Sequence, residues 1–350
     1  MVTSIEPVVE TFVSRELGSA VEKWQAEKGG AIVINPKTGA IYSMASTPTF
    51  NINNFSKVED VATFSNPLVE NVFEFGSVVK PFTMSMGLNE GVVTSETEYN
   101  DKGFVIIENK QIDNFDKKAR GVVTMQEVLN QSLNTGAVFI MQKVGKEKFK
   151  KYMINYGFTE KTNIDLPNEA KNLTSNLQSP RELEFANMSF GQGIAISPIS
   201  LTRAFTSLAN GGYIVSPHLG TDIKYRNGTD EHLEYATGTQ VLSKETSDKI
   251  TSMLVTVVDK GFDDSKYNLQ KYSIAAKTGT AQIAKEDGGG YYEDKHIHSI
   301  IGYFPAYDPQ FLVLYYLIDP KAKYAIESLK EPFLNTTKFL LNYYQVPPDR

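Results

Sequence analysis

The β-rich segments of this sequence lie at its two ends, and this placement leaves few folds open to it. Residues 31–35 and 40–45 are apolar and flank a Pro-Lys-Thr-Gly turn, which predicts a β-hairpin. Apolar runs return at residues 272–276, 299–304 and 311–318. The stretch between the two β-rich ends has a mostly helical pattern. Short, uncrossed connections favour a single sheet, so we predict five mostly antiparallel strands.

This distribution predicts an α+β fold with an insertion. The sheet and its terminal helices would come from residues 1–48 and 266–350, and a mostly helical subdomain from residues 49–265. With 350 residues, 41% of them hydrophobic, the chain is long enough for one large domain. The apolar spacing also predicts a first helix over residues 6–28, ended by Gly29 and Gly30, and a final helix over residues 327–344.

Charge and composition exclude several classes of function. A net charge of −6 and the lack of a dense basic tract argue against a nucleic acid partner. With no cysteine, the chain has no disulfide, no thiolate metal site and no cysteine nucleophile. No apolar run reaches the ~20 residues that span a bilayer, and the first residues do not resemble a signal peptide. If the protein acts outside the cell, we expect an N-terminal anchor to have been removed from it.

The first candidate motif is Ser77-Val-Val-Lys80. Pro81 is tolerated only in the first turn of a helix, so a helix beginning near Ser77 would place Ser77 and Lys80 on one face. A lysine kept neutral by burial, or by a second cation such as Lys277, can accept the proton of a serine hydroxyl. By itself, a serine three residues before a lysine usually marks only a solvated helix face.

The second candidate motif is Ser132-Leu-Asn134, which follows a helix that starts with the capping box Thr124-Met-Gln-Glu127. Both polar residues are expected in the connection to the next helix. There, Ser132 could relay a proton between a lysine and a leaving amine, and the Asn134 amide could hold a substrate carbonyl. The alternative is an ordinary turn with two capping residues.

The third candidate motif is Lys277-Thr278-Gly279-Thr280, at the end of a predicted strand. Gly279 would leave room for an extended acyl donor to pair with the strand backbone. The backbone N–H groups of Ser77 and Thr280 could form an oxyanion hole, and Lys277 with Thr278 could bind a substrate carboxylate. Strand alternation sends Lys277 and Thr278 to opposite faces, so both can serve one site only at a sheet edge.

In this order, the three motifs match the Ser-x-x-Lys, Ser-x-Asn and Lys-Thr-Gly set of penicillin-binding proteins and β-lactamases. Over nearly its whole length the chain resembles the transpeptidase domain of the class B, monofunctional penicillin-binding proteins. The resemblance also includes residues 31–46, 48–51, 75–83, 164–169, 190–193, 197–201 and 301–306. It departs from the family pattern at Phe75, Leu133 and Asn168.

The resemblance implies a serine β-lactamase-like fold and a peptidoglycan D,D-transpeptidase. Ser77 would attack the penultimate D-alanine carbonyl of a stem peptide, release the terminal D-alanine, and pass the acyl group to a neighbouring amine. Lys80, Ser132 and Lys277 would be catalytic, while Asn134, Thr278, Gly279 and Thr280 would bind substrate. β-Lactams would acylate Ser77. The resemblance further implies a bacterial membrane protein with an extracytoplasmic catalytic domain, division or elongation partners, and no cofactor.

Two other functions remain open on the sequence. A serine β-lactamase or β-lactam sensor domain shares this chemistry, although the surroundings of Glu169 do not resemble the deacylating glutamate motif of class A lactamases. A catalytically silent scaffold of the same fold is the other alternative, and the retention of every motif residue counts against it. His296 and His298 have no obvious third ligand nearby in sequence, so no metal is assigned.

Overall fold

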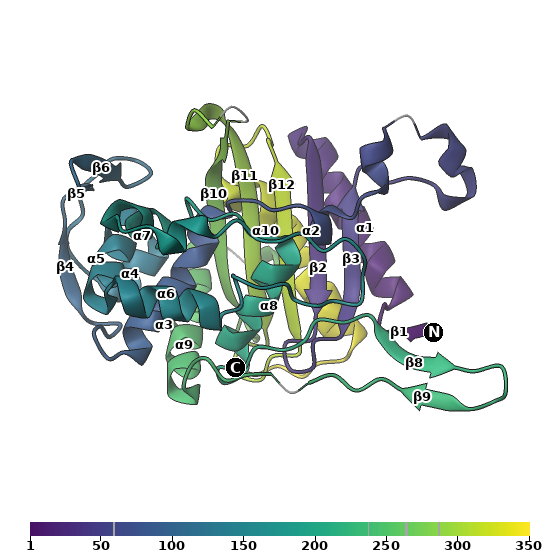
Figure 1. Ribbon diagram of the computed structural model, residues 1–350. Helices are drawn as coiled ribbons and strands as arrows, with labels where there is room; N and C mark the ends of the chain where they lie inside the picture. Colours follow the sequence, from purple (N-terminus) through teal and green to yellow (C-terminus); the bar gives the residue numbers. More distant parts are fainter. Residues whose placement is uncertain (59, 237, 263–264, 286–287) are drawn as a thin grey trace.

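The central feature of the computed structural model, which describes residues 1–58, 60–236, 238–262, 265–285 and 288–350, is a five-stranded sheet (Figure 1). Its strand order is β10-β11-β12-β2-β3, and every pair is antiparallel. The predicted sheet is therefore confirmed. The strands are β2 (Lys28–Ile34), β3 (Ile41–Thr47), β10 (Ala275–Ala284), β11 (Tyr291–Phe304) and β12 (Phe311–Ile318).

Helices cover both faces of this sheet. Helices α1 (Pro7–Trp24) and α10 (Ala325–Tyr343) pack together on one face, while α2 (Pro67–Glu70) and α8 (Pro198–Ala209) lie on the other. The central strand β12 is buried along its whole length. This double coverage explains why its sequence is a continuous apolar run and does not alternate.

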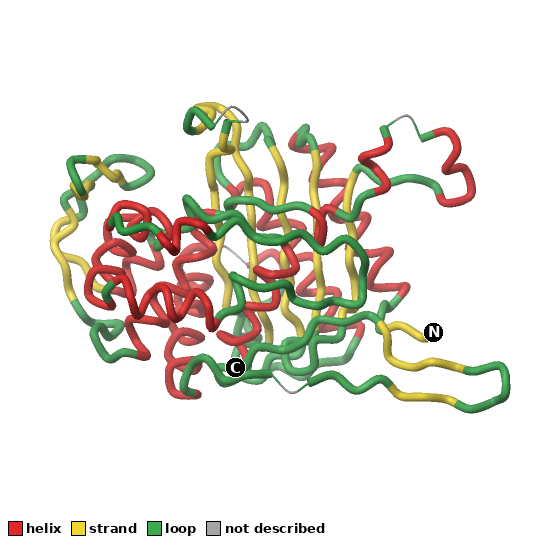
Figure 2. Tube along the Cα trace, in the orientation of Figure 1, coloured by secondary structure: helices red, strands yellow, loops and turns green. Residues whose placement is uncertain are grey.

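A group of helices lies beside the edge strand β10, as Figure 2 shows in red. Helix α9 contacts β10 directly and packs against α3. Two short hairpin-like pairs, β4 with β7 and β5 with β6, flank this group. The bounds are α3 (Lys80–Asn89), β4 (Glu98–Asp101), β5 (Phe104–Ile107), β6 (Lys110–Asp113), β7 (Gly121–Thr124), α4 (Met125–Asn130), α5 (Asn134–Val144), α6 (Lys146–Asn155), α7 (Glu182–Met188) and α9 (Lys244–Gly261).

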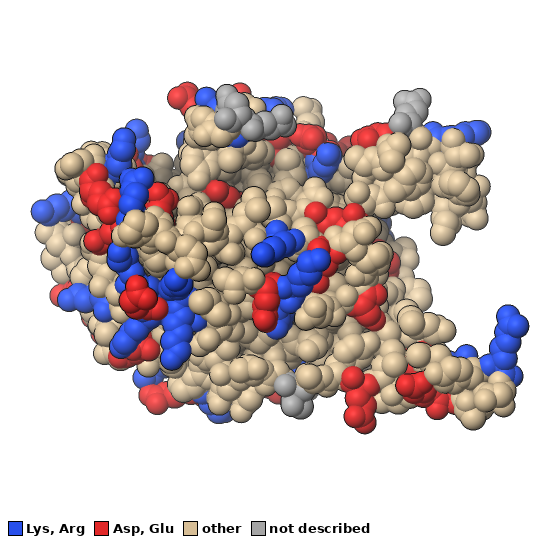
Figure 3. All heavy atoms as spheres, viewed as in Figure 1, with Lys and Arg blue, Asp and Glu red and all other residues tan. Residues whose placement is uncertain are grey.

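A small second sheet carries the start of the chain. Strand β1 (Val2–Thr3) pairs with β8 (Gly220–Lys224), which pairs with β9 (Asp230–His232) in a projecting arm (Figure 1). Acidic and basic side chains are interspersed over the face seen in Figure 3. Within the described ranges, every helix is too short or too polar to cross a membrane.

The predicted end of the first helix was wrong. Helix α1 ends at Trp24, and Gln25 takes the left-handed conformation that closes it, whereas Gly29 and Gly30 belong to strand β2. A Cβ atom on Gly30 would lie 2.4 Å from the ring of Tyr316 on the neighbouring strand. The glycine pair therefore makes room for neighbouring helices and strands to pack closely against β2, and does not stop a helix.

Candidate active site

Ser77 and Lys80 come together at the start of α3. Ser77 lies in a 3₁₀ turn, η3 (Gly76–Val79), which leads directly into α3 with Pro81 in its first turn, as predicted. The Lys80 Nζ and Ser77 Oγ atoms are hydrogen-bonded at 2.9 Å. Lys80 is 1% exposed, so the amine is held inside the protein beside the serine hydroxyl.

Close backbone packing fixes the segment that carries Ser77. Gly76 has φ of 61°, in the left-handed region, and its N–H donates to the Gly191 carbonyl at 3.3 Å. A Cβ atom on Gly76 would lie 2.9 Å from Ala281 Cβ on β10. Position 76 therefore requires glycine, because of both its backbone conformation and the lack of space for a side chain. The hydrogen bond to Gly191 ties the segment that carries Ser77 to the 190–193 block.

Ser132 connects the two candidate lysines. Lys80 Nζ donates to the Ser132 carbonyl at 2.6 Å and to its hydroxyl at 3.2 Å, and Lys277 Nζ donates to the same hydroxyl at 3.1 Å. Ser132 has φ of 56°, a left-handed conformation that costs a non-glycine residue energy. This conformation directs both the carbonyl and the hydroxyl of Ser132 toward Lys80.

The electrostatics of the cluster favour the neutral form of Lys80 beside a charged Lys277. Burial is the main cause that lowers the pKa of Lys80 well below its usual value, and the nearby charge of Lys277 lowers it further. Burial also lowers the pKa of Lys277 to about 8. A neutral amine carries a lone pair, which is what a general base beside a serine hydroxyl requires.

Strand β10 lies at the edge of the sheet. Lys277 and Thr278, which point to opposite faces of a strand, can serve one site only from such an edge. Lys277 is buried on the side of Ser132, whereas Thr280 Oγ1 accepts a hydrogen bond from the Ala325 N–H at the start of α10. Thr278 is half-buried, and its carbonyl accepts a hydrogen bond from Lys277 Nζ at 3.0 Å. A Cβ atom on Gly279 would lie 2.5 Å from the Phe75 carbonyl, so β10 and η3 are in close contact.

Asn134 is the first residue of α5, next to this cluster. Its side-chain Nδ2 donates to the Asp113 carbonyl at 2.8 Å. Leu133, the bulky middle residue of the second motif, is fully buried in the main hydrophobic core. The structure thus brings Ser77, Lys80, Ser132 and Lys277 into direct contact, while the side chains of Asn134 and Thr280 bond to other groups.

A half-buried pair near the serine was not predicted from the sequence. Tyr291 Oη donates to Glu74 Oε2 at 2.8 Å and links the start of β11 to the segment before Ser77. Burial raises the pKa of Glu74, and the hydrogen bond from Tyr291 opposes that rise. The two residues are far apart in the chain, and only the position of Glu74, three residues before Ser77, could have drawn attention to it.

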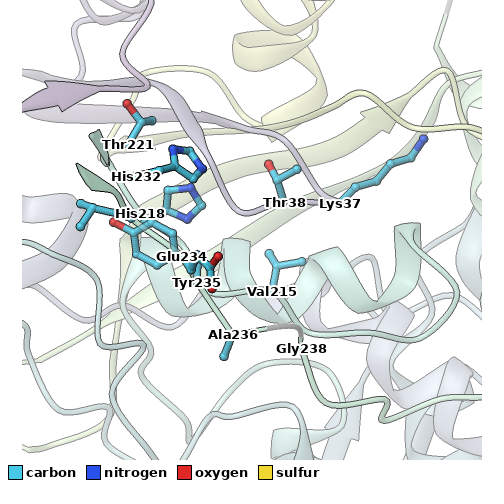
Figure 4. Close-up of a pocket in the computed structure, with 11 residues that line it drawn as sticks. Lys37, Thr38, Val215, His218, Thr221, His232, Glu234, Tyr235, Ala236 and Gly238 are labelled. Carbon is cyan, nitrogen blue, oxygen red and sulfur yellow. The ribbon is translucent and has the colours of Figure 1, made fainter. Parts of the chain in front are cut away.

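A cavity of about 390 Å³ lies away from these residues, between the turn after β2 and the segment around β8 and β9 (Figure 4). Lys37, His218 and Tyr235 are among its lining residues, and the His218 and Tyr235 rings stack at 3.7 Å. None of the predicted site residues lines it. Across the described part of the chain, no group of three or more His, Asp or Glu side chains is arranged to hold a metal ion.

The sheet, the flanking helices and the Ser77–Lys80 arrangement define the class of serine β-lactamase-like proteins. A family model for the penicillin binding protein transpeptidase domain matches residues 29–337. The chain therefore belongs to the penicillin-binding protein transpeptidase domain family. The predicted resemblance to class B members is confirmed by its relatives.

Two curated relatives and one solved structure illustrate the similarity. Stage V sporulation protein D of Bacillus subtilis is 32% identical over 322 residues, covering 91% of this chain and 49% of that protein. Peptidoglycan D,D-transpeptidase FtsI of Buchnera aphidicola (subsp. Schizaphis graminum) is 30% identical over 352 residues, 100% of this chain and 59% of that protein. The chain thus spans roughly half the length of these relatives.

Among solved structures, penicillin-binding protein 3 of Mycobacterium tuberculosis, complexed with aztreonam, superposes with a TM-score of 0.90 at 23% identity. The match covers 99% of this chain and 80% of that one. At this identity the likeness supports the fold alone.

Proposed function

We propose that this chain is the catalytic domain of a peptidoglycan D,D-transpeptidase with Ser77 as its nucleophile. The observation that carries the proposal is the contact of Ser77 with Lys80, and of both lysines with Ser132. A hydroxyl next to a buried amine of lowered pKa is the arrangement that activates serine for attack on an acyl group. The names of the FtsI relatives point to the same activity.

In the first step, neutral Lys80 accepts the Ser77 proton while Oγ attacks the carbonyl carbon of the penultimate D-alanine. The N–H groups of Ser77 and Thr280 stabilise the developing oxyanion. The C–N bond then breaks, and Ser132 passes a proton from Lys80 to the amine of the leaving D-alanine. The products are an ester on Ser77 and free D-alanine.

In the second step, an amine of a neighbouring stem peptide attacks this ester. The amine loses a proton to the Lys80–Ser132 pair, the ester C–O bond breaks, and Ser77 Oγ is protonated again. Lys277 and Thr278 hold the terminal carboxylate of the donor during the first step, and Gly279 leaves room for the donor backbone beside β10. The net reaction exchanges one amide bond for another and needs no cofactor.

A β-lactam would enter the same site as a mimic of the D-alanyl-D-alanine end and form a slowly hydrolysed ester on Ser77. A complex with aztreonam has been solved for the M. tuberculosis protein, which shares the fold. The natural setting we propose is the outer side of a bacterial cell membrane, in a protein that works with division, elongation or sporulation proteins. The name of the B. subtilis relative refers to sporulation, and that of the B. aphidicola relative to peptidoglycan transpeptidation.

The test is the intact mass of the protein after incubation with benzylpenicillin, for the native chain and for Ser77→Ala. We expect a long-lived adduct of one penicillin mass on Ser77 and none on the variant. Consumption of the drug without an adduct would indicate a β-lactamase, and an adduct without transpeptidation of stem peptides would indicate a sensor. Neither adduct nor consumption would indicate a silent scaffold.

A further inference from the structure

A buried carboxylate lies close to the candidate site and has no role in the proposed chemistry. Asp101, the last residue of β4, is 1% exposed. It accepts hydrogen bonds from the backbone N–H groups of Gly103 and Arg120, each at 3.0 Å. Burial of an ionised group is costly unless hydrogen bonds satisfy it, so this carboxylate must be held by a dense set of donors.

Two buried side chains complete that set. Asn114 Nδ2 lies 3.0 Å from each oxygen of Asp101, and Thr135 Oγ1 donates to Oδ1 at 2.8 Å. Asn114 Oδ1 in turn accepts a hydrogen bond from the Thr135 N–H at 3.2 Å. We refer to Asp101, Asn114 and Thr135 as the Asp101 cluster. It fixes the first turn of α5, where a negative charge is also favoured by the helix dipole.

Asp101 bonds to the residue that follows each partner of the hydrogen bond between Asn134 and Asp113. Thr135 directly follows Asn134, and Asn114 directly follows Asp113, whose carbonyl accepts the hydrogen bond from Asn134 Nδ2 at 2.8 Å. The donor and the acceptor of that bond are therefore positioned by the same carboxylate. A side-chain amide has two N–H groups, so anchoring one of them on Asp113 sets the direction of the other.

We propose that Asp101, acting through Asn114 and Thr135, is a positioning residue that orients the Asn134 amide toward acyl donors carrying an amide carbonyl next to the reacting bond. This proposal rests on the proposed function. It implies that the Asp101 cluster sets selectivity for the acyl donor without touching it. A loss of the cluster should therefore matter only for donors that have this carbonyl.

The chemical comparison uses two penicillins. Benzylpenicillin has a side-chain amide carbonyl, whereas 6-aminopenicillanic acid has the same reactive ring and carboxylate but no side-chain acyl group. Thr135→Val removes the hydroxyl that bonds Asp101 while keeping the shape of the side chain, and Thr135→Ser restores a hydroxyl. The second-order rate constant for acylation of Ser77 is measured for each protein with each compound.

We expect Thr135→Val to slow acylation by benzylpenicillin about tenfold, as when one hydrogen bond is lost from the transition state. Acylation by 6-aminopenicillanic acid should change less than about twofold, and Thr135→Ser should behave like the native chain. In an Asn134→Ala background, Thr135→Val should have no further effect on benzylpenicillin, because the group that it positions is absent.

A matched control is Thr336→Val on α10, which removes a buried hydroxyl bonded to Tyr315 Oη at 2.8 Å. It should leave both acylation rates unchanged. Equal slowing of both compounds by Thr135→Val, or slowing of neither, would overturn the positioning proposal. A native chain that forms no Ser77 adduct with either compound would instead overturn the proposed function.

Discussion

Lys80 and Lys277 are buried side by side, and each is placed where the charged form is disfavoured. For the single residue Lys80, this burial matters in the proposed mechanism because it favours the neutral amine. A lysine in water is protonated at neutral pH and has no lone pair to accept the Ser77 proton. Burial supplies the neutral form, and the Ser132 hydroxyl between the two amines gives the proton a route.

The pH dependence of acylation should report this coupling. Acylation needs neutral Lys80, so its rate should rise with pH as Lys80 loses its proton. Lys277→Gln removes the charge that helps to lower the Lys80 pKa, so the midpoint of the rise should move to higher pH. The measurement is the acylation rate of benzylpenicillin as a function of pH for both proteins. An unmoved midpoint would show that burial alone sets the Lys80 pKa.

The same burial should reduce stability. Because the folded-state pKa of Lys80 is lowered, the unfolded chain binds the proton more readily, and the cost to folding grows as pH falls below about 10. Lys80→Met should therefore be more stable than the native chain at pH 7, by about 1–4 kcal/mol. This advantage should shrink toward pH 10.

Urea unfolding of both proteins at pH 7 and at pH 9.5 tests this prediction. The variant should also fail to form the Ser77 adduct, because it lacks the proposed general base. A variant that is less stable at both pH values would mean that the hydrogen bonds of Lys80 outweigh its burial cost. In that case Lys80 would contribute favourably to the free energy of unfolding.

The residue-scale prediction from sequence succeeded where the contact is local. A helix turn joins Ser77 to Lys80, and Pro81 fixes where that helix starts, so their proximity follows from spacing alone. The contacts of Lys277 with Ser132, and of Glu74 with Tyr291, are made across the fold. The sequence predicted Lys277 only as a second cation near Lys80, whereas its contact with Ser132, the Glu74–Tyr291 pair and the Asp101 cluster had no local pattern to indicate them.

At the scale of elements, the decisive contact is that between the edge strand β10 and the 3₁₀ turn η3. Gly279 has no room for a side chain, because a Cβ atom there would meet the Phe75 carbonyl at 2.5 Å and Ser299 Oγ at 2.6 Å. The backbone of β10 is therefore as close to the nucleophile turn as sterics allow. The proposed oxyanion hole of the Ser77 and Thr280 N–H groups depends on this proximity.

Gly279→Ala should push β10 away from η3 and reduce acylation of Ser77 by about a hundredfold, the loss expected when an oxyanion donor is displaced. The measurement is the acylation rate with 6-aminopenicillanic acid, which has no side-chain carbonyl for Asn134 to bind. The matched control is Gly18→Ala in α1, where nothing lies within 4 Å. Gly18→Ala should leave acylation unchanged and stabilise the protein by about 0.5–1 kcal/mol. Normal acylation by Gly279→Ala would refute the steric argument.

Element boundaries were harder to predict than element types. Gly29 and Gly30 looked like a helix stop, since glycine often follows a helix. The side chains of Leu17, Val21 and Leu317 fill the space beside Gly29, which makes it part of a crowded strand. Such packing depends on residues from the other end of the chain, so single-sequence patterns could not reveal it.

At the scale of the whole molecule, the end of the chain is tied to the strand that carries Lys277. The Asp349 carboxylate accepts hydrogen bonds from the Ser273 N–H at 2.7 Å and from the Ser273 hydroxyl, just before β10. Ser273 is fully buried. Asp349 is therefore the main acceptor for two polar groups that water does not reach.

Asp349→Ala should leave these groups unsatisfied and lower the free energy of unfolding by about 1–3 kcal/mol, as measured by urea denaturation. The control is Asp308→Ala, which removes an acidic residue paired with Lys37 at the surface, where its side chain is 80% exposed. That change should cost less than about 1 kcal/mol. Equal losses for the two variants would argue against a special role for the chain end.

The order of strands in the sheet has a consequence for how the protein folds. Ile32 on β2 pairs with Leu314 on β12, so the middle of the sheet joins the two ends of the polypeptide. The β2–β3 hairpin ends at Thr47, whereas β12, the partner strand of β2, begins only at Phe311, so this pairing joins residues far apart in the chain. Such long-range closure makes folding slow and leaves an unpaired apolar edge open to aggregation. Refolding of the urea-unfolded chain should therefore be slow, and its yield should fall as the protein concentration rises.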